Sequence, residues 1–113
     1  MNIPLKFALI AGIASATLLS SGTAALAVER YVKIKNHTTV VLYRWYASPA
    51  NNNSWGSDRL VSKQVPPNYT STIDLNRAGS GCYFDFRAEF KDGDVLEKYG
   101  VDVCGGYTIE YYE

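Results

Sequence analysis

Apolar and polar residues alternate with a period of two through most of the chain after residue 27. In the segment "YVKIKN", Val32 and Ile34 fall on one side and Tyr31 and the lysines on the other. Such alternation is typical of half-buried β-strands. About seven short strands separated by turn residues predict an all-β fold, an antiparallel β-sandwich. The expected strands are 31–36, 40–47, 59–65, 69–75, 82–90, 95–104 and 107–112.

The first 27 residues carry the pattern of a secretory signal peptide. An apolar run at 7–20 follows a charged start, and residues 25–27 read Ala-Leu-Ala, the small-x-small form that signal peptidase accepts. The apolar run is shorter than the ~20 residues that a membrane-spanning helix needs. We expect its removal to leave a single β-sandwich domain at 28–113, which is 86 of the 113 residues. The predicted location is the periplasm or the cell exterior, with no membrane span after cleavage.

The two cysteines, Cys82 and Cys104, predict one disulfide, because an even count in an exported chain is usually paired. They lie in the best hairpin of the sequence, in which Asp92-Gly93 is the favoured pair for a type I′ turn. That turn places Cys82 opposite residue 103, so that Cys104 points to the other face. We therefore expect a β-bulge between Gly100 and Cys104 that brings the two sulfur atoms together.

Charge is unevenly distributed along the chain. Residues 28–81 contain seven Lys and Arg against three Asp and Glu, whereas residues 82–113 contain three against eight. We expect the two halves to face and neutralise each other; two oppositely charged surfaces are the alternative. Because the domain has no strongly basic face, we predict no nucleic-acid partner.

The segment "ASPANNNSWGSDRL" at 47–60 interrupts the strand pattern and contains the candidate binding residues. These are Asn51, Asn52, Asn53, Trp55 and Asp58. Exposed aromatic rings stack on sugar rings in carbohydrate-binding sandwiches, and Asn and Asp bind sugar hydroxyls. The interpretation that we favour is that Trp55 packs beneath its own loop while Asp58 accepts backbone N–H groups, because a long loop in a small domain needs an internal anchor. The asparagines then remain free to bind a ligand.

The sequence contains no recognisable catalytic set. The domain has one histidine, His37, in a predicted surface turn. With one histidine and two paired cysteines, a zinc site is not expected. Calcium prefers oxygen ligands, which the 47–60 loop and the pair Asp92 and Asp94 contain, so calcium or a glycan both stay open as ligands of the loop. We predict no catalytic residues, no cofactor and no metal ligands.

Several segments, which together cover essentially all of the chain after residue 27, resemble segments of a known protein family. They are "VKIKNHT", "LYRWYASP" followed by "SWGSDRL", "VPPNYTSTIDL", "CYFDFRAEFKDG" and "VDVC". These segments resemble a family of small exported bacterial β-rich proteins, most of unknown function, although Pro67-Asn68 stands where a glycine turn is common. Some members are labelled argininosuccinate lyase, a name that this chain cannot support, because such lyases are large helical tetramers. The resemblance implies the β fold and export, and no established activity.

Together these features favour an exported, non-catalytic binding or interaction module of the bacterial envelope. Its expected partner is an envelope component, a glycan or a protein. The alternative is a periplasmic inhibitor or a small-molecule enzyme.

Overall fold

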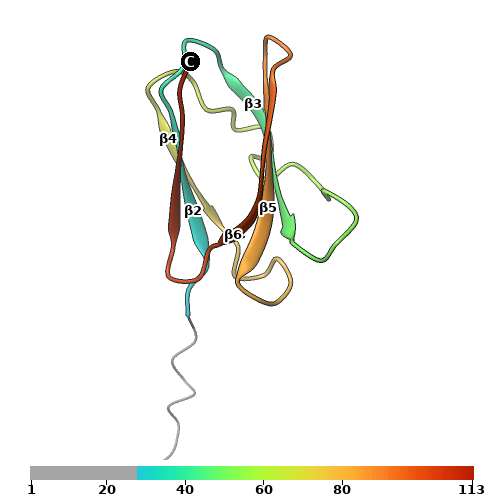
Figure 1. Cartoon of the computed structure of the whole chain (residues 1–113). Helices are drawn as coiled ribbons and strands as arrows, with labels where there is room; N and C mark the ends of the chain where they lie inside the picture. Colours follow the sequence, from blue (N-terminus) through green and yellow to red (C-terminus); the bar gives the residue numbers. More distant parts are fainter. Residues whose placement is uncertain (1–27) are drawn as a thin grey trace, which may run out of the picture.

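The computed structural model describes residues 28–113, which contain six β-strands and no helix. The strands form two three-stranded sheets, ordered β4–β2–β7 and β3–β5–β6, which face each other as two layers (Figure 1). Their bounds are β2 Tyr31–Asn36, β3 Leu42–Pro49, β4 Thr70–Asp74, β5 Tyr83–Phe90, β6 Val95–Asp102 and β7 Tyr107–Tyr111. The predicted all-β sandwich with one disulfide is confirmed, but it is not wholly antiparallel as expected, because β2 and β7 pair in parallel. The predicted signal peptide, residues 1–27, lies outside the described residues.

The number of strands is six rather than seven because the segment 59–65 does not form a strand. Val61 and Ser62 both have positive φ angles, of 49° and 69°, which break an extended conformation. Only Val65 joins a ladder there, through an isolated bridge to Leu42. The segment therefore crosses the end of the sandwich as a turn, and its apolar Leu60 and Val65 still reach the core.

Inward-facing apolar residues of both sheets form one core, in which Trp45, Phe84 and Phe86 are the largest fully buried side chains. The Trp45 indole Nε1 donates a hydrogen bond of 2.9 Å to the Tyr111 hydroxyl, which joins β3 of one sheet to β7 of the other. Burial raises the pKa of Tyr111 to about 12, so the hydroxyl stays neutral at physiological pH. Both polar atoms of this contact are thus satisfied inside an apolar core.

The β5–β6 hairpin turns differently from the predicted type I′ turn. Gly93 donates to the Phe90 carbonyl and Phe90 donates to the Asp94 carbonyl, both at 2.9 Å, and of the two predicted turn residues only Gly93 has a positive φ. This is a three-residue loop closed by a glycine bulge. The extra loop residue shifts the register by one, so that Val95 pairs with Glu89 instead of Phe90.

A second irregularity, in β6, restores the pairing register that a type I′ turn would give. Phe86 pairs with Lys98 but Phe84 pairs with Val101, so Tyr99 and Gly100 form a bulge on β6. Gly100 has a φ of 65°, a conformation that glycine adopts at little cost. Gly100, where the expected range of the bulge begins, is thus part of the bulge. The bulge does not extend towards Cys104, so it is not what brings the two sulfur atoms together.

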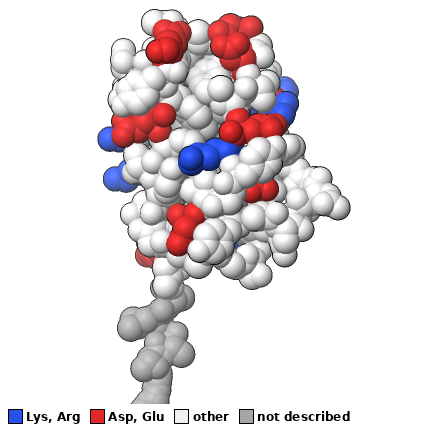
Figure 2. All heavy atoms as spheres, in the orientation of Figure 1, with Lys and Arg blue, Asp and Glu red and all other residues white. Residues whose placement is uncertain are grey.

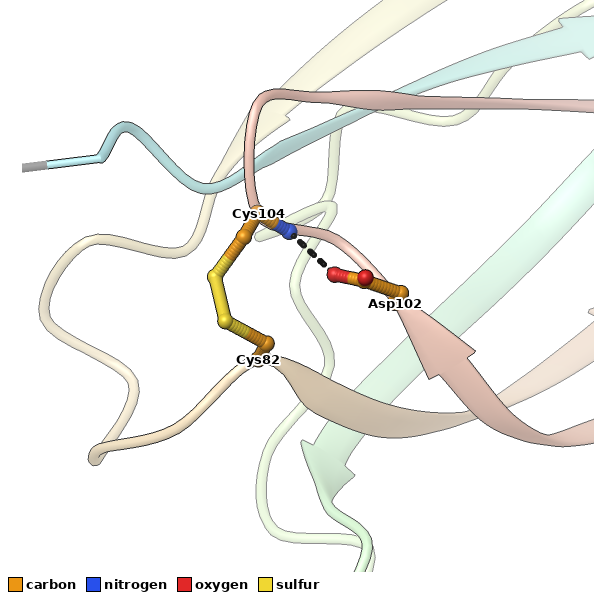
Figure 3. A group of neighbouring side chains, drawn as sticks. All are labelled: Cys82, Asp102 and Cys104. Atoms are coloured by element: carbon orange, nitrogen blue, oxygen red, sulfur yellow. Dashed lines mark hydrogen bonds between the residues drawn. A yellow bond between two sulfur atoms is a disulfide. The ribbon is translucent and has the colours of Figure 1, made fainter.

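The disulfide joins Cys82 and Cys104 across the end of the hairpin, with a distance of 5.1 Å between their Cα atoms. Beyond β6, Gly106 donates to the Val103 carbonyl, and this turn carries Cys104 round to Cys82 without a bulge. The Asp102 carboxylate accepts the Cys104 N–H at 3.0 Å and holds the turn (Figure 3).

A buried side chain, Asn36, fastens the opposite end of the sandwich. It is 1% exposed, and its amide nitrogen donates to the carbonyls of Val40 and Val65, each at 2.9 Å. Its carbonyl oxygen accepts the N–H and the hydroxyl of Thr38, at 3.0 and 2.7 Å. All four hydrogen-bonding positions of the amide are therefore used.

Within residues 28–113, no helix is long and apolar enough to cross a membrane.

Replacing Asn36 with Ala should lower the free energy of unfolding by about 2–4 kcal/mol, because it leaves buried backbone groups without partners. Chemical denaturation of residues 28–113 measures this loss. The matched control is Asn51→Ala in the exposed loop, which should cost less than about 0.5 kcal/mol. Equal effects of the two substitutions would contradict the structural role of Asn36.

Candidate functional site

The loop that follows β3 is shaped by short polar side chains. The chain turns immediately after β3, where Asn52 donates its N–H to the Pro49 carbonyl at 2.9 Å. The Asn52 side-chain oxygen then accepts the N–H of Ser54, and the Ser54 hydroxyl accepts the N–H of Gly56. These local contacts are the turn-forming role of Asn and Ser. They leave the loop exposed beside the end of the sheet.

The returning half of the loop is fastened to β3 by Asp58. Its Oδ1 accepts the N–H groups of Trp45 and Leu60, each at 3.0 Å, so the expectation that Asp58 binds backbone N–H groups is confirmed. Arg59 adds a hydrogen bond of 2.9 Å from its guanidinium to the Ala47 carbonyl. The side chain that anchors this loop in the core is Leu60, which is 3% exposed.

Trp55 does not plug the loop, so the expectation that it packs beneath its own loop is wrong. It is half-buried, and its ring lies near the Tyr99 ring of β6, with 6.1 Å between centroids and 55° between planes. Tyr99 is 61% exposed. Leu60 provides the anchor, which leaves the two aromatic rings together at the surface.

These two rings line a pocket of about 170 Å³ between the loop, β3, β5 and β6. Its other walls are polar. Of the candidate residues predicted from the sequence, the pocket contains Asn52, Asn53 and Trp55, whereas Asn51 and Asp58 are not part of its lining. The full lining is Ser48, Asn52, Asn53, Ser54, Trp55, Asp85 and Tyr99.

The β6 bulge positions the part of the pocket that the sequence did not predict. Asp85 Oδ1 accepts the N–H of Gly100 at 2.8 Å, which fixes the bulge to β5. Because a bulge changes the direction of the adjacent side chain, Tyr99 projects towards the loop instead of into the core. A glycine directly after an aromatic residue, inside an alternating strand, is the signal that could have indicated this site.

The Tyr99 hydroxyl is oriented by a charged neighbour, Glu97, to which it donates a hydrogen bond. That bond, followed by the pairing of Glu97 with Arg87, lowers the pKa of the Glu97 carboxyl below its ordinary value. The same bond raises the pKa of Tyr99. Tyr99 therefore remains a neutral donor with its ring held in place at the mouth of the pocket.

The described residues do not bring together the oxygen ligands that calcium would need in the loop. Asp58 is turned onto backbone N–H groups, away from the pocket that holds Asn52 and Asn53. In the hairpin, the Asp92 carboxylate accepts the N–H of Asp94, which is a turn contact. The interpretation of these residues as turn-forming is thereby favoured over a calcium site.

One group combines Cys82, Asp102 and Cys104 within 4.8 Å (Figure 3). The two sulfur atoms are bonded to each other, so neither is free to bind a metal as a thiolate. This group therefore has a structural role: the disulfide and the hydrogen bond from Cys104 to Asp102 hold this end of the hairpin together.

His37 lies in the turn after β2, as expected. Its Nε2 is 2.8 Å from Glu110 Oε1, and its ring stacks on Tyr112 with 4.6 Å between centroids. The Tyr112 hydroxyl donates to the same Glu110 oxygen. This exposed cluster ties the turn to β7 and lies apart from the Trp55–Tyr99 pocket.

Comparisons with known protein families, characterised proteins and solved structures find no match to this chain. The family resemblance described above therefore stays a prediction.

Because Trp55 is only half-buried, Trp55→Ala should reduce the free energy of unfolding by less than about 1.5 kcal/mol, below the ~3–5 kcal/mol of a buried tryptophan. Thermal and chemical denaturation measure the change. Iodide should quench the fluorescence of Trp55 in a Trp45→Phe background, and should quench Trp45 much less in a Trp55→Phe background. An unquenched Trp55 with a large stability loss would restore the packed-loop interpretation.

Tyr99→Phe should raise the pKa of Glu97 towards its ordinary value of 4.5, because it removes the hydrogen bond that lowers this pKa most. The pKa should stay below 4.5, since Arg87 still pairs with the carboxylate. An NMR pH titration of carboxyl shifts tests this. Because the folded-state pKa is lowered, Glu97 stabilises the fold above the ordinary pKa, and this contribution is lost as the pH falls through the folded-state pKa.

The control for this titration is Tyr112→Phe. It should raise the pKa of Glu110, whose value His37 and Tyr112 lower, and should leave Glu97 unchanged. A Glu97 pKa that does not respond to Tyr99→Phe would rule out the hydrogen bond as its cause.

Proposed function

We propose that this protein is an exported, non-catalytic binding module of the bacterial envelope, and that its Trp55–Tyr99 pocket binds one sugar ring of a glycan. The observation that carries the proposal is the pocket itself. It combines two neighbouring aromatic rings, 6.1 Å apart, with a carboxylate, two amides and two hydroxyl groups.

This combination suits a sugar for two physical reasons. The apolar C–H face of a pyranose ring packs on an aromatic ring, and Trp55 and Tyr99 present such surfaces at the rim. Sugar hydroxyls need hydrogen-bond acceptors and donors, which Asp85 and the side chains of Asn52 and Asn53 can provide. A few polar groups placed beside apolar walls are typical of small-molecule sites.

The polar groups of the pocket are already partly oriented. Asp85 uses Oδ1 for the Gly100 N–H, which leaves its second oxygen for a ligand. The Ser48 hydroxyl is buried, and its contact with the Pro49 carbonyl is long, at 3.4 Å. A ligand hydroxyl can therefore improve the hydrogen bonding of this wall.

Export is part of the same proposal. The disulfide indicates a non-cytoplasmic environment, and the signal-like residues 1–27 suit a periplasmic or extracellular location. The resemblance to small exported bacterial proteins agrees with this assignment and adds no activity to it.

The test uses residues 28–113 on an array of bacterial envelope glycans, followed by calorimetry with the glycans that bind. Trp55→Ala and Tyr99→Ala should each weaken binding by at least about tenfold, which corresponds to ~1.4 kcal/mol. Asn51→Ala is the control, because Asn51 belongs to the same loop but does not line the pocket. Absence of glycan binding, or binding that ignores both aromatic substitutions, would overturn the proposal, and turnover of a bound glycan would favour the enzyme alternative.

A further inference from the structure

The strand β6 forms an open edge of its sheet. It is the last strand in the order β3–β5–β6, and every residue from Val95 to Gly100 is exposed. The strand β7 is likewise the last strand of the other sheet. Because edge strands present unpaired backbone groups, they are templates for an additional strand. Here the two edges border the same side of the sandwich.

A groove runs between these two edges. One part, of about 360 Å³, is lined by residues 96–98 of β6 and by β7. A second part, of about 240 Å³, lies beside the hairpin turn and the C-terminus. Leu96 lines both parts, so the groove follows β6 towards its hairpin end.

The groove exposes part of the apolar interior. Leu96 pairs with Ala88, which is fully buried, so the two side chains share the inner face of the sheet. Nevertheless Leu96 is 45% exposed, because none of the strands within residues 28–113 lies beyond β6 to cover it. An inward-facing leucine left uncovered indicates room for one further strand.

The charges around the groove favour a basic occupant. Its two parts are lined by five carboxylates and a single ammonium group. Figure 2 shows several separate acidic patches on one face, with basic side chains at its margins and one near its middle. The carboxylates are Asp92, Asp94, Glu97, Glu110 and Glu113, and the ammonium group is that of Lys98.

The basic half of the domain does not neutralise this surface through direct pairs, contrary to the expectation from the sequence. Among the ion pairs of residues 28–113, Arg87 contacts Glu89 and Glu97 within the acidic half. Only His37–Glu110 joins the two halves. The uneven distribution of charge along the chain therefore remains as an uneven distribution of charge on the surface.

A second copy of the chain is a poor occupant. When two copies of one strand pair antiparallel about a two-fold axis, side chains directly opposite each other point to the same face of the sheet. The axis must therefore pass through a pair formed by the same residue of each copy. Centring on the middle of β6 places Glu97 against Glu97 or Lys98 against Lys98. Like charges placed directly opposite are destabilising.

We propose that the edge of β6 binds an extended segment of another protein, with alternating apolar and basic residues, as a fourth strand of the sheet. Its apolar side chains cover Leu96, and its Lys or Arg side chains face the carboxylates that line the groove. Backbone hydrogen bonds to β6 hold the segment, as in other cases of β-strand addition. This surface is separate from the Trp55–Tyr99 pocket.

The register predicts which backbone groups the added strand uses. Phe90 donates to the Asp94 carbonyl, so the even-numbered residues Leu96 and Lys98 direct their backbone groups towards β5. The N–H groups of Val95 and Glu97 therefore point away from the sheet and are available to a partner.

The probe is a fluorescein-labelled peptide of about ten alternating valine and lysine residues, the length of a long strand. A matched peptide of alternating valine and glutamate is the control. Fluorescence anisotropy with residues 28–113 should show binding at least about tenfold tighter for the lysine peptide at low salt, with a smaller difference at high salt. Equal binding of both peptides, or no binding of the lysine peptide, would overturn the proposal.

Two measurements locate the bound peptide. Hydrogen exchange followed by NMR should show new protection of the Val95 and Glu97 amides, with no new protection of the Leu96 and Lys98 amides. Val95→Pro should abolish binding, because it removes an outward N–H without breaking the ladder to β5, whereas Val95→Thr should retain binding. Protection without this alternation, or dimerisation through β6 in sedimentation of the protein alone, would contradict an added strand from another protein.

Discussion

The buried amide of Asn36 is the contact on which the arrangement of the two sheets depends. Its side chain holds the turn that leads from β2 to β3 and also reaches Val65, at the end of the connection that returns from β3. Its backbone N–H donates to Tyr69 and its carbonyl accepts from Asn68, just before β4. One residue therefore fixes two connections at the same end of the sandwich, the β2–β3 turn and, at two points, the connection from β3 to β4. Because its partners are backbone groups and the Thr38 hydroxyl, all of them polar, no apolar side chain of similar size could replace it.

The opposite end depends on charge and covalent chemistry. The Arg30 guanidinium donates to the carbonyls of Asn76, Gly79 and Gly81, at 2.7–2.9 Å, and so shapes the loop that precedes Cys82. Between the two ends, the Trp45–Tyr111 hydrogen bond joins the sheets inside the core. With both ends fastened, the loop after β3 is free to be polar and exposed, and its Trp55 lies outside the core.

The sequence predicts the inward faces well because alternation reports burial directly. Val32 and Ile34 of β2, and the apolar residues of β5, are buried as expected. The sequence does not predict where the backbone leaves the β region. Val61 and Ser62 have left-handed conformations, so the predicted strand at 59–65 does not form. The exposure of Tyr99 followed from two compensating register shifts, each of a single residue, which no local pattern specifies. Half of the candidate site was thus predictable from the loop, and the half contributed by β5 and β6 was not.

The parallel pairing of β2 with β7 has a consequence for the order in which the chain folds. It joins the first described strand to the last, with Val32 beside Tyr107, and β2 is also the centre of its sheet. That sheet cannot be completed until β7 has been synthesised, and contacts between segments so distant in the sequence form slowly. Until then β2 can pair only with β4, and its other edge stays open.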